Sequence, residues 1–400
     1  MKITSDRLSV LVAAVLSLAS AAQAEVRRVP QTYRTISAAI AASYDGDVVE
    51  VGPGTYAEGL NFGGREITVR STAGAATTIV DPVSGRCLTA TGQKGAGARL
   101  EGFTLRGGSA NEGGGVYVSA SSPVLVNCVI TGNTATYSGG GVHVASGSLQ
   151  LTGCTVSQNT SINGIGGGVY VQSYATLQVT GGEVTGNTSR SGGGVYVDNY
   201  ATVTASNWVM SGNVASSAEG GGVCARYGVS LELTGCTVSG NRSIGNGGGL
   251  WTNDGSVVVS SSLVEANQSG GYGGAWYVTS GTPTLQSCEV KNNTAVTVGG
   301  IWVASGPVRV GGTVFCGNGV NINGSWTDLG GNQLNGQCPP YCPGDASGNA
   351  VVDGADIGLT ISRWGICEGD SCYSDFNGDG IVNGADLGDV LSHWGRCPGW

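Results

Sequence analysis

Gly113-Gly114-Gly115-Val116-Tyr117-Val118 is the stretch that decides the fold of this chain. The pattern, glycines followed by an apolar–aromatic–apolar triplet, returns with some variation. The later copies begin at Gly139, Gly166, Gly192, Gly220, Gly247, Gly273 and Val298. A short period that holds through so many copies is typical of a solenoid, in which each copy forms one coil stacked on its neighbours.

A second marker keeps step with the first: an apolar residue stands three positions before an asparagine. The series runs from Ile130 and Asn133 to Phe315 and Asn318. Between the markers lie short alternating stretches such as Leu149-Gln150-Leu151, with no helical period. Each coil is therefore predicted to contain two or three short strands, and parallel pairing of strands one coil apart would build a β-helix.

Because the coils stack, equivalent positions of successive repeats form a column of side chains that share one environment. Val116 and Val118 should face the core and Tyr117 should face outward, because side chains alternate along a strand. The equivalent outward positions form one file: Tyr117, His143, Tyr170, Tyr196, Cys224, Trp251, Tyr277 and Trp302. The corner asparagines are expected to adopt left-handed backbone angles and to hydrogen-bond the asparagine of the next coil.

Composition excludes two classes of protein. The 73 glycines do not recur at every third position and prolines number only 10, which excludes a collagen. The formal net charge is −9 and no basic cluster exists, so we expect no nucleic-acid partner.

The first residues predict export. Lys2 and Arg7 precede the apolar run Leu8–Leu18, and Ala22-Gln23-Ala24 offers a cleavage site, as in a signal peptide over residues 1–24. The apolar run is short for a membrane span. We expect a secreted or cell-surface protein with no transmembrane segment after signal removal. The 12 cysteines are then compatible with disulfide bonds.

The paired markers resemble the repeats of chlamydial polymorphic outer-membrane proteins and related bacterial β-helix passengers. Near the start, Tyr33-Arg34-Thr35-Ile36-Ser37-Ala38-Ala39-Ile40 and Pro53-Gly54-Thr55-Tyr56 are similar to the entry of a pectin-lyase-like β-helix. These resemblances imply an all-β, right-handed, single-stranded parallel β-helix over residues 25–337. They also imply that the segment from Tyr33 to Ile40 is a short helix capping the core.

Two acidic loops follow in the C-terminal region, residues 338–400. Oxygen-bearing side chains occupy positions 1, 3, 5, 9 and 12 of each loop, a ligand pattern that suits calcium. The candidate ligands are Asp345, Ser347, Asn349, Asp353 and Asp356, then Asp375, Asn377, Asp379, Asn383 and Asp386. A helix should leave each loop, since Leu387, Val390, Leu391 and Trp394 are spaced for one apolar face.

This tandem resembles a dockerin, a small helical module that attaches exported proteins to a partner. The resemblance implies calcium as a cofactor and a cohesin-like protein as a partner. Cysteines flank each copy, and the pairs Cys342–Cys367 and Cys372–Cys397 are our interpretation among the pairings that four cysteines allow. Cys338 would then pair with Cys316 or stay free.

One charged patch breaks the neutral repeats. Asp198, Arg226 and Asp254 fall close together in consecutive copies, so stacking would bring them within two coils. Two carboxylates could serve hydrolysis, and an arginine could serve as a lyase base. The alternative is a surface ion-pair ladder that contributes little.

Three hypotheses about function follow. The favoured one is a non-catalytic exported β-helix that binds a polysaccharide or cell-surface glycan. Its candidate residues are Tyr117, Tyr170, Tyr196, Trp251, Tyr277 and Trp302, unless a loop covers the file or the rings only stabilise the sheet. The second is a polysaccharide lyase or a glycoside hydrolase that hydrolyses O-glycosyl bonds of plant- or algal-type polysaccharide at the charged patch. The third treats the coil as a spacer for the C-terminal module.

Overall fold

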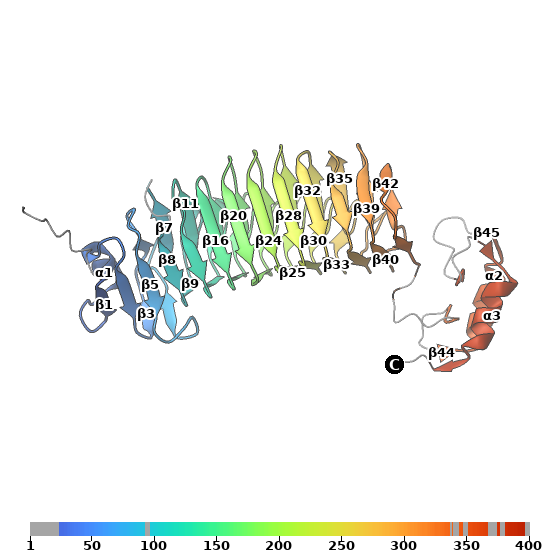
Figure 1. Ribbon diagram of the computed structural model, residues 1–400, viewed down its shortest axis with the longest axis horizontal. Coiled ribbons are helices and arrows are strands. Elements are labelled where there is room, and N and C mark those ends of the chain that lie inside the picture. The colour runs from blue at the N-terminus through green and yellow to red at the C-terminus, as the bar shows by residue number, and fades with distance from the viewer. Residues whose placement is uncertain are drawn as a thin grey trace, which may run out of the picture.

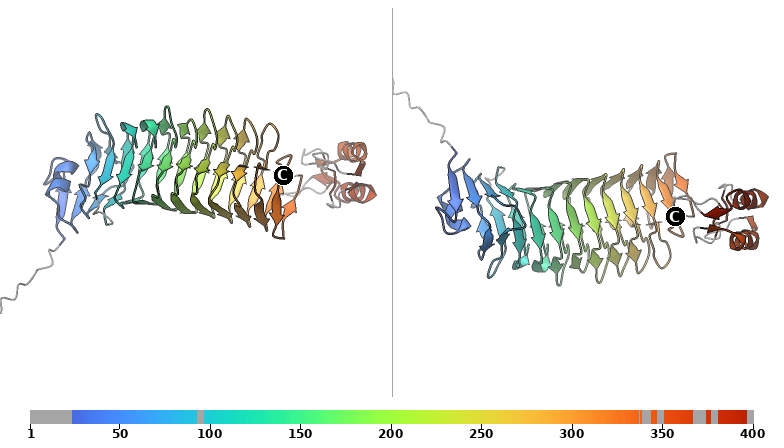
Figure 2. Two further views of the ribbon diagram at one scale, coloured as in Figure 1. Left: turned by 90° about the horizontal axis from the view of Figure 1, so that it is seen from above. Right: turned by 90° about the horizontal axis from the view of Figure 1, so that it is seen from below.

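The computed structural model describes residues 24–92, 97–336, 338, 344–346, 351–366, 374–376 and 381–396. Its main body is a stack of coils whose strands form four long parallel sheets (Figure 1). The coils lie side by side along one axis in all three views (Figures 1 and 2). Within the described residues, no helix is long and apolar enough to cross a membrane.

Sheet A has 13 strands, and from β8 on each of its strands follows a sheet C strand along the chain. It consists of β1 (Val26–Val29), β2 (Val48–Val51), β5 (Thr68–Ser71), β8 (Arg99–Glu101), β12 (Val124–Val126), β16 (Ser148–Thr152), β20 (Thr176–Thr180), β24 (Thr202–Ser206), β28 (Ser230–Thr234), β32 (Ser256–Ser260), β36 (Thr284–Gln286), β39 (Val308–Gly311) and β42 (Trp326–Asp328).

Sheet B has 12 strands and follows sheet A in each coil. It consists of β3 (Gly54–Tyr56), β6 (Thr78–Val80), β9 (Thr104–Arg106), β13 (Val129–Thr131), β17 (Thr155–Ser157), β21 (Glu183–Thr185), β25 (Val209–Ser211), β29 (Thr237–Ser239), β33 (Leu263–Glu265), β37 (Glu289–Lys291), β40 (Val314–Cys316) and β43 (Gln333–Leu334).

Sheet C has 11 strands and carries the apolar–aromatic–apolar triplets. It consists of β4 (Leu60–Asn61), β7 (Leu88–Thr91), β11 (Val116–Ser119), β15 (Val142–Val144), β19 (Val169–Val171), β23 (Val195–Val197), β27 (Val223–Arg226), β31 (Leu250–Asn253), β35 (Trp276–Ser280), β38 (Ile301–Val303) and β41 (Ile322–Asn323).

Sheet D is shorter, with seven strands, and lies between sheets B and C in the chain. It consists of β10 (Ser109–Glu112), β14 (Thr134–Ser138), β18 (Thr160–Ser161), β22 (Thr188–Ser189), β26 (Val214–Ala215), β30 (Arg242–Ser243) and β34 (Gln268–Ser269). Middle coils therefore contain four strands, one more than the sequence predicts.

The core follows the predicted alternation. Val116, Val118, Val142 and Val144 are fully buried, and the apolar residues of every coil join one continuous cluster. At the N-terminal end, α1 (Ile36–Ala42) packs Ile36 and Ile40 onto this cluster. The predicted capping helix is confirmed, with its N-terminus capped by the Thr35 hydroxyl.

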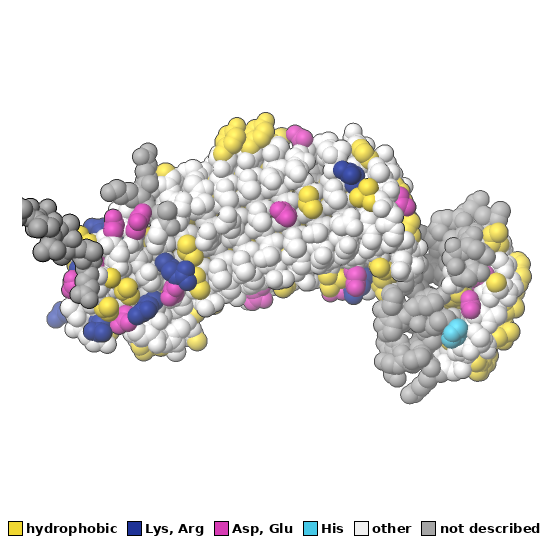
Figure 3. Space-filling view, in the orientation of Figure 1, with side chains coloured by type: hydrophobic (Ala, Val, Ile, Leu, Met, Phe, Trp, Pro, Cys, Tyr) yellow, Lys and Arg dark blue, Asp and Glu magenta, His cyan; other side chains and the backbone are white. Residues whose placement is uncertain are grey.

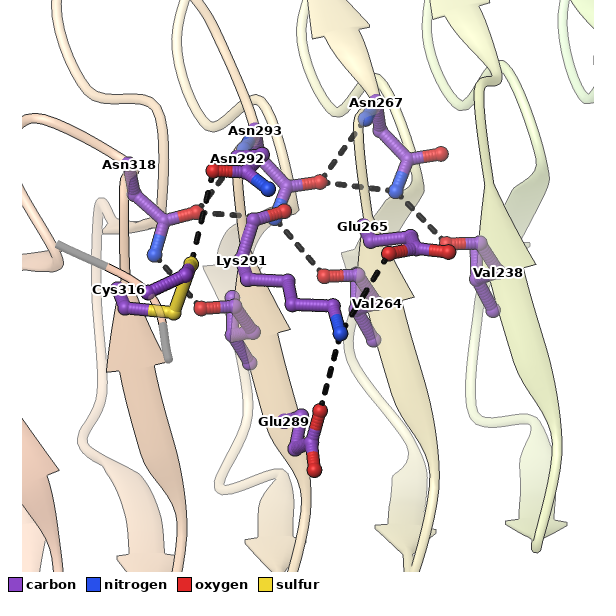
Figure 4. A network of polar contacts seen from close by, with 12 residues as sticks. Val238, Val264, Glu265, Asn267, Glu289, Lys291, Asn292, Asn293, Cys316 and Asn318 are labelled. Atoms are coloured by element: carbon purple, nitrogen blue, oxygen red, sulfur yellow. Dashed lines mark hydrogen bonds and ion pairs between the residues drawn. A yellow bond between two sulfur atoms is a disulfide. The ribbon is translucent and has the colours of Figure 1, made fainter. Parts of the chain in front are cut away.

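A buried asparagine ladder runs through the corners after sheet B. The side-chain oxygen of Asn293 accepts from the backbone N and from Nδ2 of Asn267, at 3.0 and 2.9 Å (Figure 4). The same pair of bonds repeats along Asn133, Asn159, Asn187, Asn213, Asn241, Asn267, Asn293 and Asn318. The predicted bonding between asparagines is confirmed.

The left-handed residue at this corner is not the ladder asparagine but the residue before it. Examples are Gly132 with φ +63° and Gly186 with φ +63°. Because the chain reverses one position earlier, the asparagine amide points inward and hydrogen-bonds the asparagines of the neighbouring coils. The expectation of left-handed asparagines is wrong for this reason.

The glycine runs are required by the close approach of neighbouring backbones. Gly139 has φ +61°, which glycine adopts without strain. A side-chain carbon on Gly140 would lie 2.5 Å from the carbonyl oxygen of Gly167 and 2.6 Å from that of Thr160. The run therefore seals the join between sheets D and C.

The C-terminal residues form a separate pair of helices, α2 (Gly354–Ser362) and α3 (Gly384–Ser392). Two short antiparallel pairs accompany them: β44 (Val351–Val352) with β47 (Gly395–Arg396), and β45 (Gly365–Ile366) with β46 (Ile381–Val382). The predicted helix after each loop is present. Val352 and Val390 are fully buried, with Ile357 and Phe376 packed against them. Leu391 and Trp394, expected on the apolar face, are instead each 56% exposed. The residue of α3 that is buried in this small core is Val390.

Candidate functional site

The outward file is in register, as the repeat predicts. Cross-strand pairing joins Tyr117 to His143, Tyr170 to Tyr196, and Trp251 to Tyr277, and continues without a break from β11 to β38. The rings contact one another: Tyr170 and Tyr196 meet edge to face with centroids 5.6 Å apart. The file is thus one continuous column of side chains on sheet C.

The middle of this file is covered, which is one of the two alternatives that the sequence left open. Tyr170, Tyr196 and Trp251 are each 5 to 6% exposed, and His143 and Cys224 are fully buried. Tyr117, Tyr277 and Trp302 are half-buried. Three of the six candidate carbohydrate-binding residues are therefore enclosed.

The cover comes from the segments that join sheet D to the glycine runs. Ile165 packs against the buried aromatic cluster, and the ring of Tyr272 contacts Trp302 with centroids 4.5 Å apart. At the start of the file the cover is different: Arg86, just before β7, lies over the ring of Tyr117, 4.4 Å from its centroid. These loops vary in length, so the period of the sheets does not predict where they lie.

The charged patch is only partly assembled. Asp198 and Arg226 are neighbours, because the register of the sheet C strands aligns them at the strand ends. The same column begins with Gln172 and continues to Asn253. Arg226 Nη2 pairs with Glu219 Oε2 at 3.0 Å, and its guanidinium lies 4.6 Å above the ring of Trp251.

Asp254 lies apart from this pair. It is exposed in a left-handed turn, φ +65°, where its carboxylate accepts from the backbone N of Gly255. The register also shifts at this point, between Thr252 and Asn253. The carboxylate that pairs with Arg226 is therefore Glu219 and not Asp254. Glu219 lies in the loop before the glycine run of its coil, and no sequence pattern indicated it.

Asp198 has an unusual environment for a carboxylate. It is 7% exposed, and the Tyr170 hydroxyl donates to both of its oxygens, at 3.2 and 3.3 Å. Burial raises the pKa of Asp198 above its ordinary value of 3.8, although hydrogen bonds from Tyr170 and Asn199 and the charge of Arg226 act in the opposite direction. A carboxyl with this character can hold a proton at a higher pH than usual.

His143 is not arranged as a catalytic base. Its Nδ1 faces the Ser138 hydroxyl at 3.4 Å and Glu112 at 3.8 Å, while Nε2 faces the Gln172 amide oxygen at 3.3 Å. A triad would need the acid and the nucleophile on opposite ring nitrogens. Burial lowers the pKa of His143 to about 4, so the ring is neutral at neutral pH.

Two exposed tyrosines lie in the turns that follow the sheet C strands β19 and β23. Tyr174 and Tyr200 are 76% and 59% exposed, and their rings stack with centroids 5.3 Å apart and an interplanar angle of 11°. Tyr227, 51% exposed, follows in the next coil. We call these three residues the tyrosine ridge. Figure 3 shows hydrophobic side chains gathered at the upper edge, over the coils of β20, β24 and β28.

The turns that carry the ridge are held by backbone hydrogen bonds. Tyr174 and Tyr200 both have φ +63°, a conformation fixed because their backbone N atoms donate to the following coil. The ring of Tyr200 lies on Gly228, where an added side-chain carbon would come within 2.4 Å of it. Aligned tyrosines at one turn of consecutive repeats were the signal available in the sequence.

A pocket of about 290 Å³ lies elsewhere, at the end of the asparagine ladder. Its walls are formed by residues 293–297, 299 and 317–320, which include no titratable side chain. It therefore has no group for acid–base chemistry.

The described part of the two acidic loops forms the starts of the two helices. Asp353 and Asp356 form a capping box at α2, and Asn383 and Asp386 form one at α3. Asp386 Oδ1 also accepts from the backbone N of Phe376 at 2.8 Å. Asp345 is 5% exposed, while Asp356 and Asp386 are fully buried.

The other candidate ligands, Ser347, Asn349, Asn377 and Asp379, lie outside the described residues, and so do Cys342, Cys367, Cys372 and Cys397 and the signal segment 1–23. No group of three acidic, histidine or cysteine side chains able to hold a metal occurs among the residues that the structure describes. Cys338 pairs with Cys316, one of the two outcomes left open by the sequence.

The fold and its ladder define the class: the chain is a right-handed parallel β-helix protein. A family model described as "Right handed beta helix region" matches residues 152–334. Two solved structures are similar to the chain. Pectin methylesterase from carrot has 14% sequence identity and a TM-score of 0.37, over 70% of this chain and 88% of that one. Pectate lyase Pel9A has 14% identity and a TM-score of 0.33, over 87% and 86%. No curated protein matches the sequence.

Proposed function

We propose that this protein binds a neutral polysaccharide through the tyrosine ridge and does not cleave it. The observation that carries the proposal is the stacked pair Tyr174 and Tyr200, which is exposed on turns held by backbone hydrogen bonds. Aromatic rings held in water lose unfavourable hydration when the C–H face of a sugar ring covers them. Exposed apolar patches of this kind mark interaction sites.

The geometry of the ridge leaves one ring face open. Because the two rings stack along the coil axis, the outer face of Tyr174 and the hydroxyl-bearing edges of both rings remain for a ligand. The preceding coil has one residue fewer between its paired strands than the turn of Tyr174 has. That shorter turn comprises residues 145–147.

Charge favours a neutral ligand over an acidic one. The guanidinium of Arg226, beside Tyr227 in the chain, is already paired with Glu219. Asp254 is exposed in the turn one coil beyond Tyr227. An acidic sugar would meet a carboxylate without an available cation, whereas a neutral sugar carries no such cost.

Export and attachment complete the proposal. Residues 1–24 would direct export, and residues 338–400 would form a dockerin-like module that attaches the coil to a cohesin-like protein. The donor set fits calcium, since the residues at the ligand positions carry oxygen donors, which this hard cation prefers, and a carboxylate such as Asp356 or Asp386 can accept several contacts at once. Asp345, Asp353 and Asp356 would hold one ion, and Asp375, Asn383 and Asp386 a second, each with loop ligands named above. Bound calcium would neutralise these carboxylates and stabilise the module.

The experiment is affinity electrophoresis of the full chain in soluble neutral glycans and in polygalacturonate, with released sugar measured in parallel. Replacing Tyr174 and Tyr200 together by alanine should weaken binding about tenfold or more. Tyr44→Ala is the matched control, since Tyr44 is also 76% exposed but directly follows the capping helix α1 and its C-cap Ser43. Unchanged binding by the double variant, or tighter binding to polygalacturonate than to every neutral glycan, would overturn the proposal.

A second candidate function rests on Asp198. A buried carboxyl with a raised pKa, near Arg226, has the character of a general acid in a glycoside hydrolase or lyase. This reading predicts sugar release that Asp198→Asn and Arg226→Ala abolish. Release unaffected by both substitutions would exclude this patch.

A further inference from the structure

One column of the coil is rich in cysteine. It is the position just before each sheet B strand, and its side chains face the core. From β9 to β40 the column contains Phe103, Cys128, Cys154, Gly182, Trp208, Cys236, Ser262, Cys288 and Thr313. Only Cys128 and Cys154 occupy adjacent positions in this column.

We propose that Cys128 and Cys154 form a disulfide bond that links two neighbouring coils. The residues that follow them, Val129 and Thr155, are paired in register, and Thr155 N donates to the Cys128 carbonyl at 2.9 Å. Neighbouring parallel strands lie about 4.8 Å apart, which falls inside the range of Cα separations that a disulfide spans, about 4.4–6.8 Å.

The two sulfur atoms occupy equivalent positions in neighbouring coils. Both are free thiols in the structure, with side chains 0% and 2% exposed. Cys128 Sγ donates to the Leu100 carbonyl at 3.5 Å, and Cys154 Sγ donates to the carbonyl of Leu125, the in-register partner of Leu100, at 3.4 Å. Formation of the disulfide therefore needs no shift of register.

The chemistry is thiol–disulfide exchange with an oxidised dithiol carrier, the class of oxidant present where exported proteins fold. The Cys154 thiolate attacks the carrier disulfide, forms a mixed disulfide and releases one carrier thiolate. The Cys128 thiolate then attacks the Cys154 sulfur and releases the second. Two protons pass from the cysteines to the carrier, which leaves as a dithiol. Because both thiols are buried in the folded coil, the exchange precedes closure of these coils.

Cys236 and Cys288 provide an internal contrast. Ser262 lies between them: Cys236 N donates to Ser262 Oγ at 2.9 Å, and Ser262 N donates to Cys288 Sγ at 3.4 Å. Two coil steps separate these cysteines by about 9.6 Å, too far for a disulfide. Their chemistry and burial resemble those of the proposed pair, and only the spacing differs.

The test is peptide mapping of the full chain, exported through an oxidising compartment, unfolded in the presence of an alkylating reagent and digested without reductant. We expect a disulfide-linked peptide pair containing Cys128 and Cys154, lighter than the two thiol peptides by two hydrogen atoms. Cys236 and Cys288 should be alkylated. Recovery of Cys128 and Cys154 as alkylated thiols in that chain, and again after refolding in a glutathione redox buffer, would overturn the proposal.

Stability provides a second readout that does not depend on the map. The melting temperature of the wild-type chain should fall in reductant by more than that of the Cys128→Ser/Cys154→Ser variant, which retains Cys316–Cys338. Cys236→Ser should keep the full wild-type response. An equal response of the double variant and the wild type would contradict the cross-link.

Discussion

The hydroxyl of Tyr170 donates to Asp198 Oδ1 across one coil step, at 3.2 Å, under the loops that cover the outward file. Tyr170 is paired in register with Tyr196, two residues before Asp198, so the bond joins β19 to the end of β23. A carboxylate in this position is both desolvated and held by a neutral donor. Its protonation should therefore affect the stability of the coil.

The first prediction concerns this carboxyl. Because burial raises the folded-state pKa of Asp198 above 3.8, the folded chain binds more protons than the unfolded chain between the two values. The contribution of Asp198 to the free energy of unfolding therefore falls as pH rises through this window. Asp198→Asn should remove this dependence and gain stability relative to wild type as pH rises. Urea unfolding between pH 3 and pH 7 measures how the free energy of unfolding depends on pH in wild type and variant. Asp254→Asn, in an exposed turn, is the control and should keep the wild-type pH dependence.

The second prediction concerns His143. Its pKa is lowered from 6.5 to about 4, chiefly by burial, so the unfolded chain binds more protons between these values. Stability should be fully present above about pH 6.5 and decrease by about 3 kcal/mol as pH falls to 4. His143→Tyr, which restores the residue of the neighbouring coils, should flatten this dependence. Titration of the His143 signal near its ordinary pKa, with that NMR signal identified by its loss in His143→Tyr, would contradict the assignment.

The third prediction concerns the ladder. Asn213 accepts from the backbone N and Nδ2 of Asn187 and donates to the carbonyl of Val184. Asn213→Ala leaves these buried groups without partners and should destabilise the chain by about 3 kcal/mol or more. Asn163→Ala, at an exposed loop position, should change stability by no more than about 0.5 kcal/mol. Similar losses for the two variants would show that the ladder does not stabilise the fold.

The fourth prediction concerns calcium. Removal of calcium with a chelator should open residues 344–396 to proteolysis and leave the strand signal of the coil unchanged, because the carboxylates of Asp356 and Asp386 lose their proposed counter-ion. Circular dichroism and protease mapping of the full chain measure both parts. Equal cleavage with and without calcium would refute the calcium assignment, and loss of the coil signal would refute the separation of the two regions.

The repeat was sufficient to predict the coil because register follows from a fixed period. Once Val116 faces the core, pairing places Tyr117, His143 and Tyr170 in one column, and the buried valines confirm the orientation. The two C-terminal helices were also predictable from the local spacing of apolar residues, and the capping helix was implied by the family resemblance.

The candidate site was less predictable because its cover comes from loops of unequal length. Nothing in the spacing shows that Ile165 and Tyr272 contact the aromatic file or that Glu219 pairs with Arg226. The displacement of Asp254 depends on a register shift and a left-handed turn, which are local responses of the backbone to its neighbours. The sheets repeat and their loops do not, and for this reason the fold was easier to predict than the surface.

The ladder has a consequence for how such a chain can change over time. Each internal asparagine of the ladder accepts hydrogen bonds from the asparagine one coil earlier and donates to the asparagine one coil later. Asn318 ends the ladder, because its Nδ2 donates to Asn321 instead. Insertion or deletion of one whole coil would therefore leave every remaining rung fully bonded. Between the helix at one end and the Cys316–Cys338 bond at the other, the length of the protein is free to drift by tandem duplication or loss without a new core having to evolve.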